Sequence, residues 1–286
     1  MIPGDTEPIW IFSAYILAGL VGYGGYRAKA LSASGAVAAC VIGGIIFGFG
    51  GLPWAFVLIA FFASSSLLSF FKTSDSRKIR ASETFEKGGR RDAAQVLANG
   101  SVATVLAALS ILMGGATLPY LFAGFVGALA AATADTWATE IGVLSKARPR
   151  MLTSWKMVNA GTSGAVTLTG IGAAFAGAMF LGIVGAAAVL LQGEITHSGQ
   201  ALVLAALAGG MGGSMLDSLL GATLQASYRC PQCEKATESR IHSCGATAQL
   251  MKGIPIINND VVNFAATLTG ALLGALVYSA ALSSAL

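Results

Sequence analysis

The sequence predicts an all-α integral membrane protein with about eight transmembrane helices, in a single domain that spans residues 1–286. Hydrophobic residues make up 55% of the chain and charged residues only 10%, with a mean hydropathy of +0.73. A soluble domain carries about 25% charged residues, so this composition excludes an ordinary soluble protein. The 37 glycines also favour closely packed helices, because small residues let helix backbones approach one another.

The individual helices follow from runs of apolar residues, since a helix needs about 20 of them to cross a bilayer. The sequence contains eight such runs, at residues 9–26, 34–50, 53–71, 94–113, 117–133, 166–192, 200–222 and 262–285. We interpret the first run as a retained helix rather than a signal peptide. The segment before it contains two acids and no basic residue, whereas a signal peptide begins with a positively charged region.

The orientation follows from the Lys and Arg residues, which mark cytoplasmic loops. All 17 of them fall in alternate connections between the predicted helices. We therefore predict cytoplasmic loops at about 72–93, 134–165 and 223–261, in addition to the short first connection, and both termini outside. The expected location is the cell inner membrane or an equivalent membrane.

Five acids collect at the predicted cytoplasmic face, together with two asparagines: Asp92, Asp135, Glu140, Asp217, Asp260, Asn99 and Asn263. Asp217 is flanked by apolar residues, and an acid inside a membrane is a functional candidate by default. For Asp92 and Asp260 a second interpretation stays open, because an acid at the start of a helix is also a good N-cap.

Carboxylates beside basic residues indicate a site for Mg²⁺ and phosphate groups, since Mg²⁺ is usually held by one or two carboxylates and the substrate's phosphates. We predict Asp135, Glu140, Asp217 and Asp260 as Mg²⁺ ligands. Lys87, Arg90 and Arg91 are candidates for binding phosphate oxygens. The stretch GTSG is expected to open a helix and to offer backbone N–H groups to an anion; it comprises Gly161, Thr162, Ser163 and Gly164.

A second kind of metal site is indicated by four residues in one predicted cytoplasmic loop: Cys230, Cys233, His242 and Cys244. Four soft ligands at short spacing predict a tetrahedral structural Zn²⁺ site, with unligated loop cysteines as the alternative. A disulfide is not expected on the reducing side of the membrane.

The tetrapeptide TLTG occurs twice, at residues 167–170 and 267–270, each time early in a predicted helix. Each copy follows a helix with an acid–hydroxyl pair, Asp135-Thr136 or Asp217-Ser218. Two explanations stay open: a duplicated helix–loop–helix unit, or a chance identity in a chain rich in Ala, Gly and Leu.

Five segments together resemble one membrane family: GGRRDAAQVLANG, ADTWATEIG, GTSGAV, GSMLDSLLGATLQ and NNDVVNFAATLTGALLGA. The family, formerly a domain of unknown function, includes transmembrane protein 19 and the plant and cyanobacterial phytyl-phosphate kinases. The resemblance runs in order from about residue 30 to the end of the chain. The motif residues that carry over are Arg90, Asp92, Asn99, Asp135, Glu140, Gly161, Thr162, Asp217, Asp260 and Asn263.

The resemblance implies a Mg²⁺-dependent membrane kinase of isoprenoid metabolism, such as tocopherol biosynthesis. Such an enzyme transfers the γ-phosphate of CTP or another nucleoside triphosphate to an isoprenoid monophosphate, for example phytyl phosphate, and forms the diphosphate. The catalytic residues are then expected among Asp135, Glu140, Asp217, Asp92, Asn99 and Asn263. The expected partners are this lipid substrate, the nucleotide and membrane lipids, with no nucleic acid.

Three other classes of protein stay open. One is a non-catalytic membrane scaffold, against which the cluster of acids argues. A transporter also carries acids within its helices, although its binding site usually lies near the bilayer midplane, whereas these acids gather at one face. A Mg²⁺-dependent lipid cytidylyltransferase or phosphatidyltransferase uses similar acids.

Overall fold

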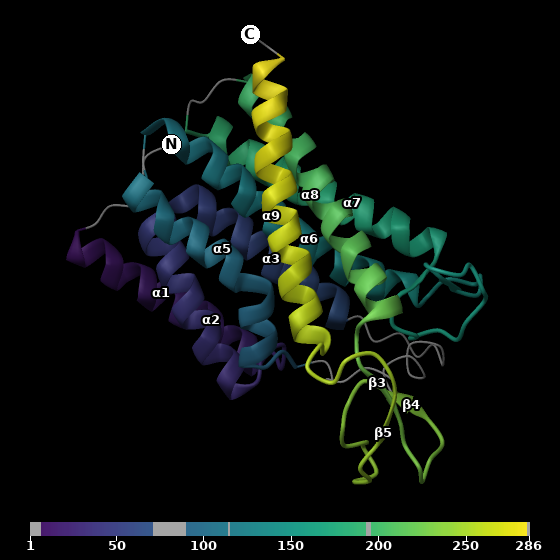
Figure 1. Cartoon of the computed structure of the whole chain (residues 1–286). Helices are drawn as coiled ribbons and strands as arrows, with labels where there is room; N and C mark the ends of the chain where they lie inside the picture. The colour runs from purple at the N-terminus through teal and green to yellow at the C-terminus, as the bar shows by residue number, and fades with distance from the viewer. Residues whose placement is uncertain (1–6, 71–89, 114, 193–195, 285–286) are drawn as a thin grey trace.

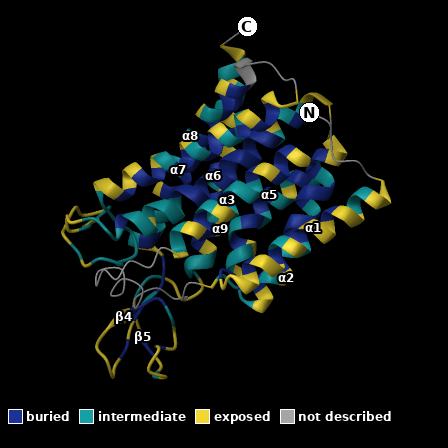
Figure 2. Ribbon diagram, turned by 180° about the vertical axis from the view of Figure 1, so that it is seen from behind, coloured by how far each residue is buried: buried dark blue, intermediate teal, exposed yellow. Residues whose placement is uncertain are grey.

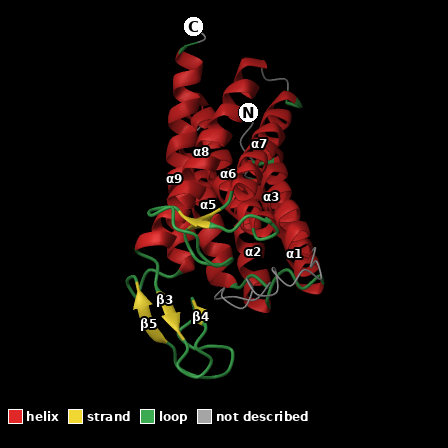
Figure 3. Ribbon diagram, turned by 90° about the vertical axis from the view of Figure 1, so that its right-hand side faces the viewer, coloured by secondary structure: helices red, strands yellow, loops and turns green. Residues whose placement is uncertain are grey.

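The computed structural model describes residues 7–70, 90–113, 115–192 and 196–284. It is a bundle of long helices with two small β elements in the connections (Figures 1 and 3). The helices are α1 (Pro8–Arg27), α2 (Ala33–Ile45), α3 (Leu52–Phe70), α5 (Ala93–Met113), α6 (Leu118–Gly142), α7 (Leu168–Leu190), α8 (Thr196–Thr223) and α9 (Asn259–Ser283). A π-helical turn, η1 (Ile46–Gly50), continues α2, and a 3₁₀ turn, η2 (Gly115–Thr117), precedes α6.

Eight spans in the described part of the chain are long and apolar enough to cross a membrane, which confirms the predicted fold class. The short strands are an addition that hydropathy does not reveal. Strands β1 (Arg150–Met151) and β2 (Ala165–Val166) pair between α6 and α7. Strands β3 (Ser227–Arg229), β4 (Ala236–Thr237) and β5 (Gln249–Lys252) form an antiparallel sheet of order β4-β3-β5 between α8 and α9, beyond the ends of the helices (Figure 3).

Several helices begin at residues whose side chains cap the first turn. Ser32, Thr167 and Asn258 each accept a hydrogen bond from the backbone N–H three residues on, at the starts of α2, α7 and α9. Such a cap satisfies a donor that the helix itself leaves unpaired. The local sequence thereby fixes where these helices leave the connecting segments.

Helix α6 forms the centre of the bundle, with its middle buried on all sides (Figure 2). Gly127 of α6 contacts the backbone of Gly270 in α9, and Gly209 of α8 lies against both. A side chain at any of these glycines would collide with the neighbouring backbone. The three helices therefore pack at the close distance that small residues permit.

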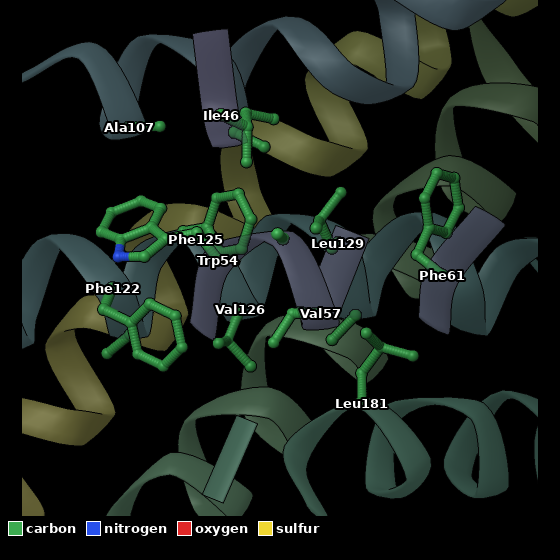
Figure 4. Close-up of a cluster of buried hydrophobic side chains, with 14 of the residues drawn as sticks. Ile46, Trp54, Val57, Phe61, Ala107, Phe122, Phe125, Val126, Leu129 and Leu181 are labelled. Carbon is green, nitrogen blue, oxygen red and sulfur yellow. The ribbon is translucent and has the colours of Figure 1, made fainter. Parts of the chain in front are cut away.

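The other side of α6 packs through aromatic rings (Figure 4). Trp54 of α3 lies with its ring centroid 5.2 Å from that of Phe122 and 4.6 Å from that of Phe125. The outer surface is apolar instead of polar: on α1, for example, Phe12, Ile16 and Leu20 are exposed. This inversion of the pattern of a soluble protein fits helices surrounded by lipid.

The described residues of the connections that contain Lys and Arg meet at one end of the bundle, which we call the polar end. There the backbone N–H of Ser32 donates to the carbonyl of Arg91 (3.0 Å), so the segment before α5 lies against the start of α2. At the same end Ser69 of α3 bonds to Glu140 of α6, and Lys252 bonds to the end of α8. The arrangement agrees with the alternation of basic residues in the sequence.

One expected boundary differs from the structure, and one open question about a repeat is answered. Helix α6 continues to Gly142, whereas the apolar run ends at residue 133; Asp135 and Glu140 therefore lie within the helix and not in a loop that begins at 134. Hydropathy reports where the apolar side chains end, but the backbone hydrogen bonds of a helix do not depend on side-chain polarity and here continue to Gly142. The two TLTG copies also occupy different places, because Thr167 is the N-cap of α7 and Thr267 lies in the third turn of α9. They do not mark equivalent positions of a repeat.

Candidate functional site

Asp135 of α6 and Asp217 of α8 form the centre of the candidate site. One turn earlier, the Cα of Gly213 in α8 packs against the Ala131 side chain in α6. Both helices run toward the polar end, so residues four positions further along again face each other. The two carboxylates are accordingly close enough for their charges to interact. A cation bound by both carboxylates would offset their mutual repulsion.

One oxygen of this pair lacks a donor. The Oδ2 atom of Asp217 is buried and has no hydrogen-bond partner among the described residues. An unpaired buried acceptor costs about 1–3 kcal/mol, and more when it is charged. A divalent cation bound by carboxylate oxygens would remove this cost, so the residues fit the predicted Mg²⁺ site.

Asp260 and Asn263 approach the same region from α9. They share one helical stripe with Thr267 and Gly270, and Gly270 packs against Gly127 of α6. The stripe therefore faces the interior, and Asn263 is 6% exposed. The N-cap of α9 is Asn258, whose Oδ1 accepts from the N–H of Val261 at 3.1 Å. The capping role that the sequence left open for Asp260 is thus filled by its neighbour.

Glu140 lies on a different side of α6. It follows Asp135 by five residues, which turns it about 140° around the helix, so it faces α3 instead of α8. Its Oε1 accepts from Ser69 Oγ at 2.8 Å. The structure therefore does not place all four predicted Mg²⁺ ligands around one point; it brings together Asp135, Asp217 and the α9 stripe.

The two described arginines before α5, Arg90 and Arg91, differ in their surroundings. Arg91 is half-buried, donates to Ser66 Oγ at 3.3 Å, and its charge interacts with that of Glu140. Burial lowers the pKa of its guanidinium, and the charge of Glu140 acts in the opposite direction. Arg90 is exposed and can therefore meet a ligand from solvent. Lys87 lies outside the described residues.

The side chains of Asp92 and Asn99 form hydrogen bonds with the backbone of α5. The Oδ1 of Asp92 accepts from the N–H of Gln95 at 2.9 Å, which is N-cap geometry for α5. Asn99 donates to the carbonyl of Gln95 at 3.2 Å. These bonds support the structural alternative for Asp92.

The expectation that GTSG opens a helix was wrong, because α7 starts only at Leu168, after its cap Thr167. Residues 161–164 form turns before β2, with Gly161 at φ 84° and Gly164 at φ 80°, values that glycine adopts without strain. Ser163 donates to Gln225 Oε1 at 2.8 Å, and Gly164 packs against the backbone of Ala222 at the end of α8. The stretch docks the α6–α7 connection onto α8.

Beside this connection lies an open pocket of about 310 Å³, lined by Arg148, Met157, Val158, Asn159 and Thr162. Its volume is at the lower end of the range of small-molecule sites. Thr162 itself donates to the carbonyl of Asn159 at 2.8 Å. Arg148 is a basic residue of this pocket that the sequence did not single out, because it is one of several in a polar loop.

The four predicted zinc ligands come together in the α8–α9 connection. Their ligand atoms all lie within 4.8 Å of one another. Cys230 Sγ is 3.5 Å from Cys244 Sγ, and His242 Nδ1 is 3.1 Å from Cys244 Sγ.

Glu238, in the same connection, is a site residue that the sequence analysis missed. It is 9% exposed, and its charge interacts with those of Asp217 and Lys252. In the sequence it is one acid in a hydrophilic loop, with no pattern that separates it from its neighbours. Only the folding of the loop back onto α8 reveals it.

Comparison with known proteins places this geometry in a family. Residues 16–271 match the family described as integral membrane protein DUF92. Protein PGR of Arabidopsis thaliana is 34% identical over 285 residues, which cover 92% of this chain and 95% of that protein. A membrane protein of Methanocaldococcus jannaschii, MJ0933, is 30% identical over 252 residues, 88% of this chain and 87% of that one. The chloroplastic protein VTE6 of Arabidopsis thaliana is 29% identical over 236 residues, 82% of this chain and 61% of that one. No solved structure gives a significant match.

Proposed function

From its membership of the DUF92 family of integral membrane proteins, shown by the match over residues 16–271, we propose that this protein is a membrane kinase. It transfers the γ-phosphate of CTP or another nucleoside triphosphate to an isoprenoid monophosphate such as phytyl phosphate. The products are the prenyl diphosphate and the nucleoside diphosphate. The motif resemblance to phytyl-phosphate kinases and the similarity to VTE6 support this choice of substrate.

The observation that carries the proposal is the Asp135–Asp217 pair, with its buried and unpaired Asp217 Oδ2, at the end of the bundle where the basic connections meet. Mg²⁺ bound there would neutralise phosphate charge and bridge the nucleotide to the protein. Asp135 and Asp217 would hold it, with Asp260 as a further ligand from α9. Arg90 and Arg148 are exposed or pocket-lining cations that suit the outer phosphate oxygens.

The reaction requires neither a general base nor a covalent nucleophile from the protein. An oxygen of the acceptor phosphate forms a bond to the γ-phosphorus, and the bond from that phosphorus to the β,γ-bridging oxygen breaks. The acceptor phosphate is already ionised, so no general base has to remove a proton. Catalysis of this kind consists mainly of positioning and charge stabilisation. That fits a site with carboxylates and arginines and no nucleophile–base pair among its candidate residues.

The helices that carry these acids also present an apolar, lipid-facing surface on their outer side. Met215 and Leu219 flank Asp217 on α8, and Val261 and Phe264 flank Asn263 on α9; all four are exposed apolar side chains. An isoprenoid tail can lie along this lipid-facing surface while its phosphate reaches the polar end. With the basic connections in the cytoplasm, we expect both termini outside and the site open to cytoplasmic nucleotide.

The direct test uses purified protein with Mg²⁺, a panel of nucleoside triphosphates and several prenyl monophosphates, with products identified by mass spectrometry. We expect a prenyl diphosphate that requires Mg²⁺ and is lost in Asp135→Asn. The matched control is Asp92→Asn, since Asn caps a helix about as well as Asp.

The same assay separates the alternative functions. A cytidylyltransferase would form a CMP-containing lipid, and a phosphatidyltransferase would join two lipid groups, so either product mass would replace the present proposal. If no lipid product forms but the protein moves a solute across proteoliposome membranes, and Asp217→Asn stops that movement, the acids belong to a transporter.

A further inference from the structure

The connection between α8 and α9, residues 224–258, contains a ready-made tetrahedral ligand set. A metal with bonds of about 2.3 Å to sulfur holds its ligand atoms about 3.8 Å apart. The separation of Cys230 Sγ and Cys244 Sγ, 3.5 Å, is close to this value, and the sulfur–nitrogen distance of 3.1 Å to His242 is shorter, as the shorter metal–nitrogen bond requires. Three sulfurs and one imidazole nitrogen favour Zn²⁺.

Backbone turns hold the ligands from both sides. In the first, the N–H of Glu234 donates to the carbonyl of Cys230 at 2.9 Å, and the N–H of Cys233 points to Cys230 Sγ at 3.5 Å. In the second, the N–H of Gly245 donates to the carbonyl of His242 at 2.8 Å. An N–H group directed at sulfur stabilises the thiolate, which is the form that binds metal.

The connection has little else to hold it folded. Its strands are two to four residues long, and its described hydrophobic cluster consists of Ala226, Tyr228 and Ala248. Sheets of this size are not independently stable, and small domains of this kind usually obtain their folding free energy from a metal. A disulfide does not take this role, because all three cysteines of the connection are free.

We propose that residues 224–258 form a zinc-ordered module that holds Lys252 against the end of α8 and keeps Glu238 buried at the same end of the bundle as Asp217. The statement about zinc is independent of the proposed function. The role of Glu238 in binding Mg²⁺–nucleotide rests on that function. A site with all four positions occupied by protein leaves no place for substrate, so the zinc is structural.

The contacts of the module with α8 are specific. Lys252 Nζ donates to the carbonyl of Gly221 at 2.9 Å, which satisfies one of the carbonyls that a helix end leaves unpaired. The N–H of Ile254 donates to the carbonyl of Leu224 at 2.9 Å, and the N–H of Ala226 to that of Ile257 at 2.8 Å. Because these bonds join the two ends of the module to each other and Lys252 to the end of α8, the folding of the module determines where Glu238 lies.

Glu238 and Glu234, two acids of the same module, differ in their burial. Glu238, which lies between the two ligand pairs in the sequence, is buried, and its charge interacts with that of Asp217. Glu234, four residues earlier, is exposed and faces Arg229 at 3.7 Å. The two acids therefore form a matched pair of positions, one directed at the helix bundle and one at solvent.

Metal analysis of the purified full-length protein tests the zinc. We expect about one zinc per chain, retained in Cys40→Ser, which changes a cysteine in α2, and lost in the double variant Cys230→Ser, Cys233→Ser. Co²⁺ exchanged into the wild type should give the visible absorption of a tetrahedral thiolate site. Wild-type protein that carries no zinc when prepared without chelators, or Co²⁺ absorption that persists in the double variant, would overturn the proposal.

The role of Glu238 is tested by Glu238→Gln against Glu234→Gln. We expect both variants to keep their zinc, so both modules are folded. Glu238→Gln should lower turnover and Mg²⁺–CTP affinity by about 10- to 100-fold, as loss of a residue that supports a metal site typically does, while Glu234→Gln stays at the wild-type level. Equal values in the two variants would refute the placement of Glu238. If the wild type has no kinase activity at all, the proposed function fails, but the zinc measurement still decides the module.

Discussion

The most informative change is Asp217→Asn, because it removes one charge and keeps the shape of the side chain. In the wild type without metal, Asp217 Oδ2 is buried without a donor and interacts with the charge of Asp135. The amide removes the repulsion, and its NH₂ group can donate to the remaining carboxylate. An unpaired buried group costs about 1–3 kcal/mol, so we expect metal-free Asp217→Asn to be more stable than the wild type by an amount of that order.

Activity should move in the opposite direction. If Asp217 holds the metal, its loss removes charge stabilisation from the transition state and should lower turnover by on the order of 10²-fold or more, equivalent to about 2.7 kcal/mol. The stabilisation that Mg²⁺–CTP gives to the wild type should also disappear, since a ligand stabilises a protein only in proportion to its affinity for the folded state.

Thermal unfolding in detergent, with chelator and with Mg²⁺–CTP, measures both stability effects, and the mass-spectrometric assay measures turnover. In a protein of this size about 1 kcal/mol shifts the unfolding temperature by roughly 2–4 °C, which is well resolved. Asp92→Asn is the control, because Asp92 caps α5 and should change neither quantity. The reasoning is refuted if Asp217→Asn unfolds at a lower temperature than the wild type without Mg²⁺ and still responds normally to Mg²⁺–CTP.

Three further predictions follow from single positions. Arg91→Lys should destabilise the protein by about 1–3 kcal/mol, because a lysine cannot repeat the planar guanidinium's bond to Ser66 Oγ together with its interaction with Glu140. Arg90→Lys should leave the unfolding temperature unchanged and reduce turnover, so equal unfolding temperatures for the two variants would contradict this prediction. Gly127→Ala should prevent normal folding, since a methyl group there would meet the backbone of α9, whereas Gly172→Ala, which meets nothing within 4 Å, should fold normally; monodisperse Gly127→Ala in size-exclusion chromatography would count against the packing. Glu234→Gly should stabilise the zinc-bound protein by about 1 kcal/mol, because Glu234 has φ 56° and glycine adopts this conformation without strain; an unchanged unfolding temperature would argue against strain at this residue.

The sequence was sufficient for the properties that depend on short stretches of chain. Bilayer thickness sets the length of an apolar run, so the eight helices could be located to within a few residues in most cases. The alternation of basic residues likewise predicted which connections meet at one end. The Cys/His spacing predicted a ligand cluster, because two close pairs in one short loop have little freedom to separate. The family resemblance also followed from local motifs.

The pairing of side chains from different helices was decided only by the tertiary structure. Asp135 faces Asp217 because Gly213 lets α8 approach Ala131 one turn earlier, and such a contact between distant segments has no local signature. The same limit explains why Glu140 was grouped with Asp135, although the helix turns it toward Ser69.

Glu238 illustrates the difference most directly. Its own neighbours in sequence are those of an exposed loop, and it becomes part of the site only when the module folds back onto α8. Hydropathy and residue spacing report whether each segment prefers lipid or water. This preference was enough to predict the helices and the polar end. Which carboxylates face each other depends on helix rotation and backbone approach, and those are set by packing over the whole bundle.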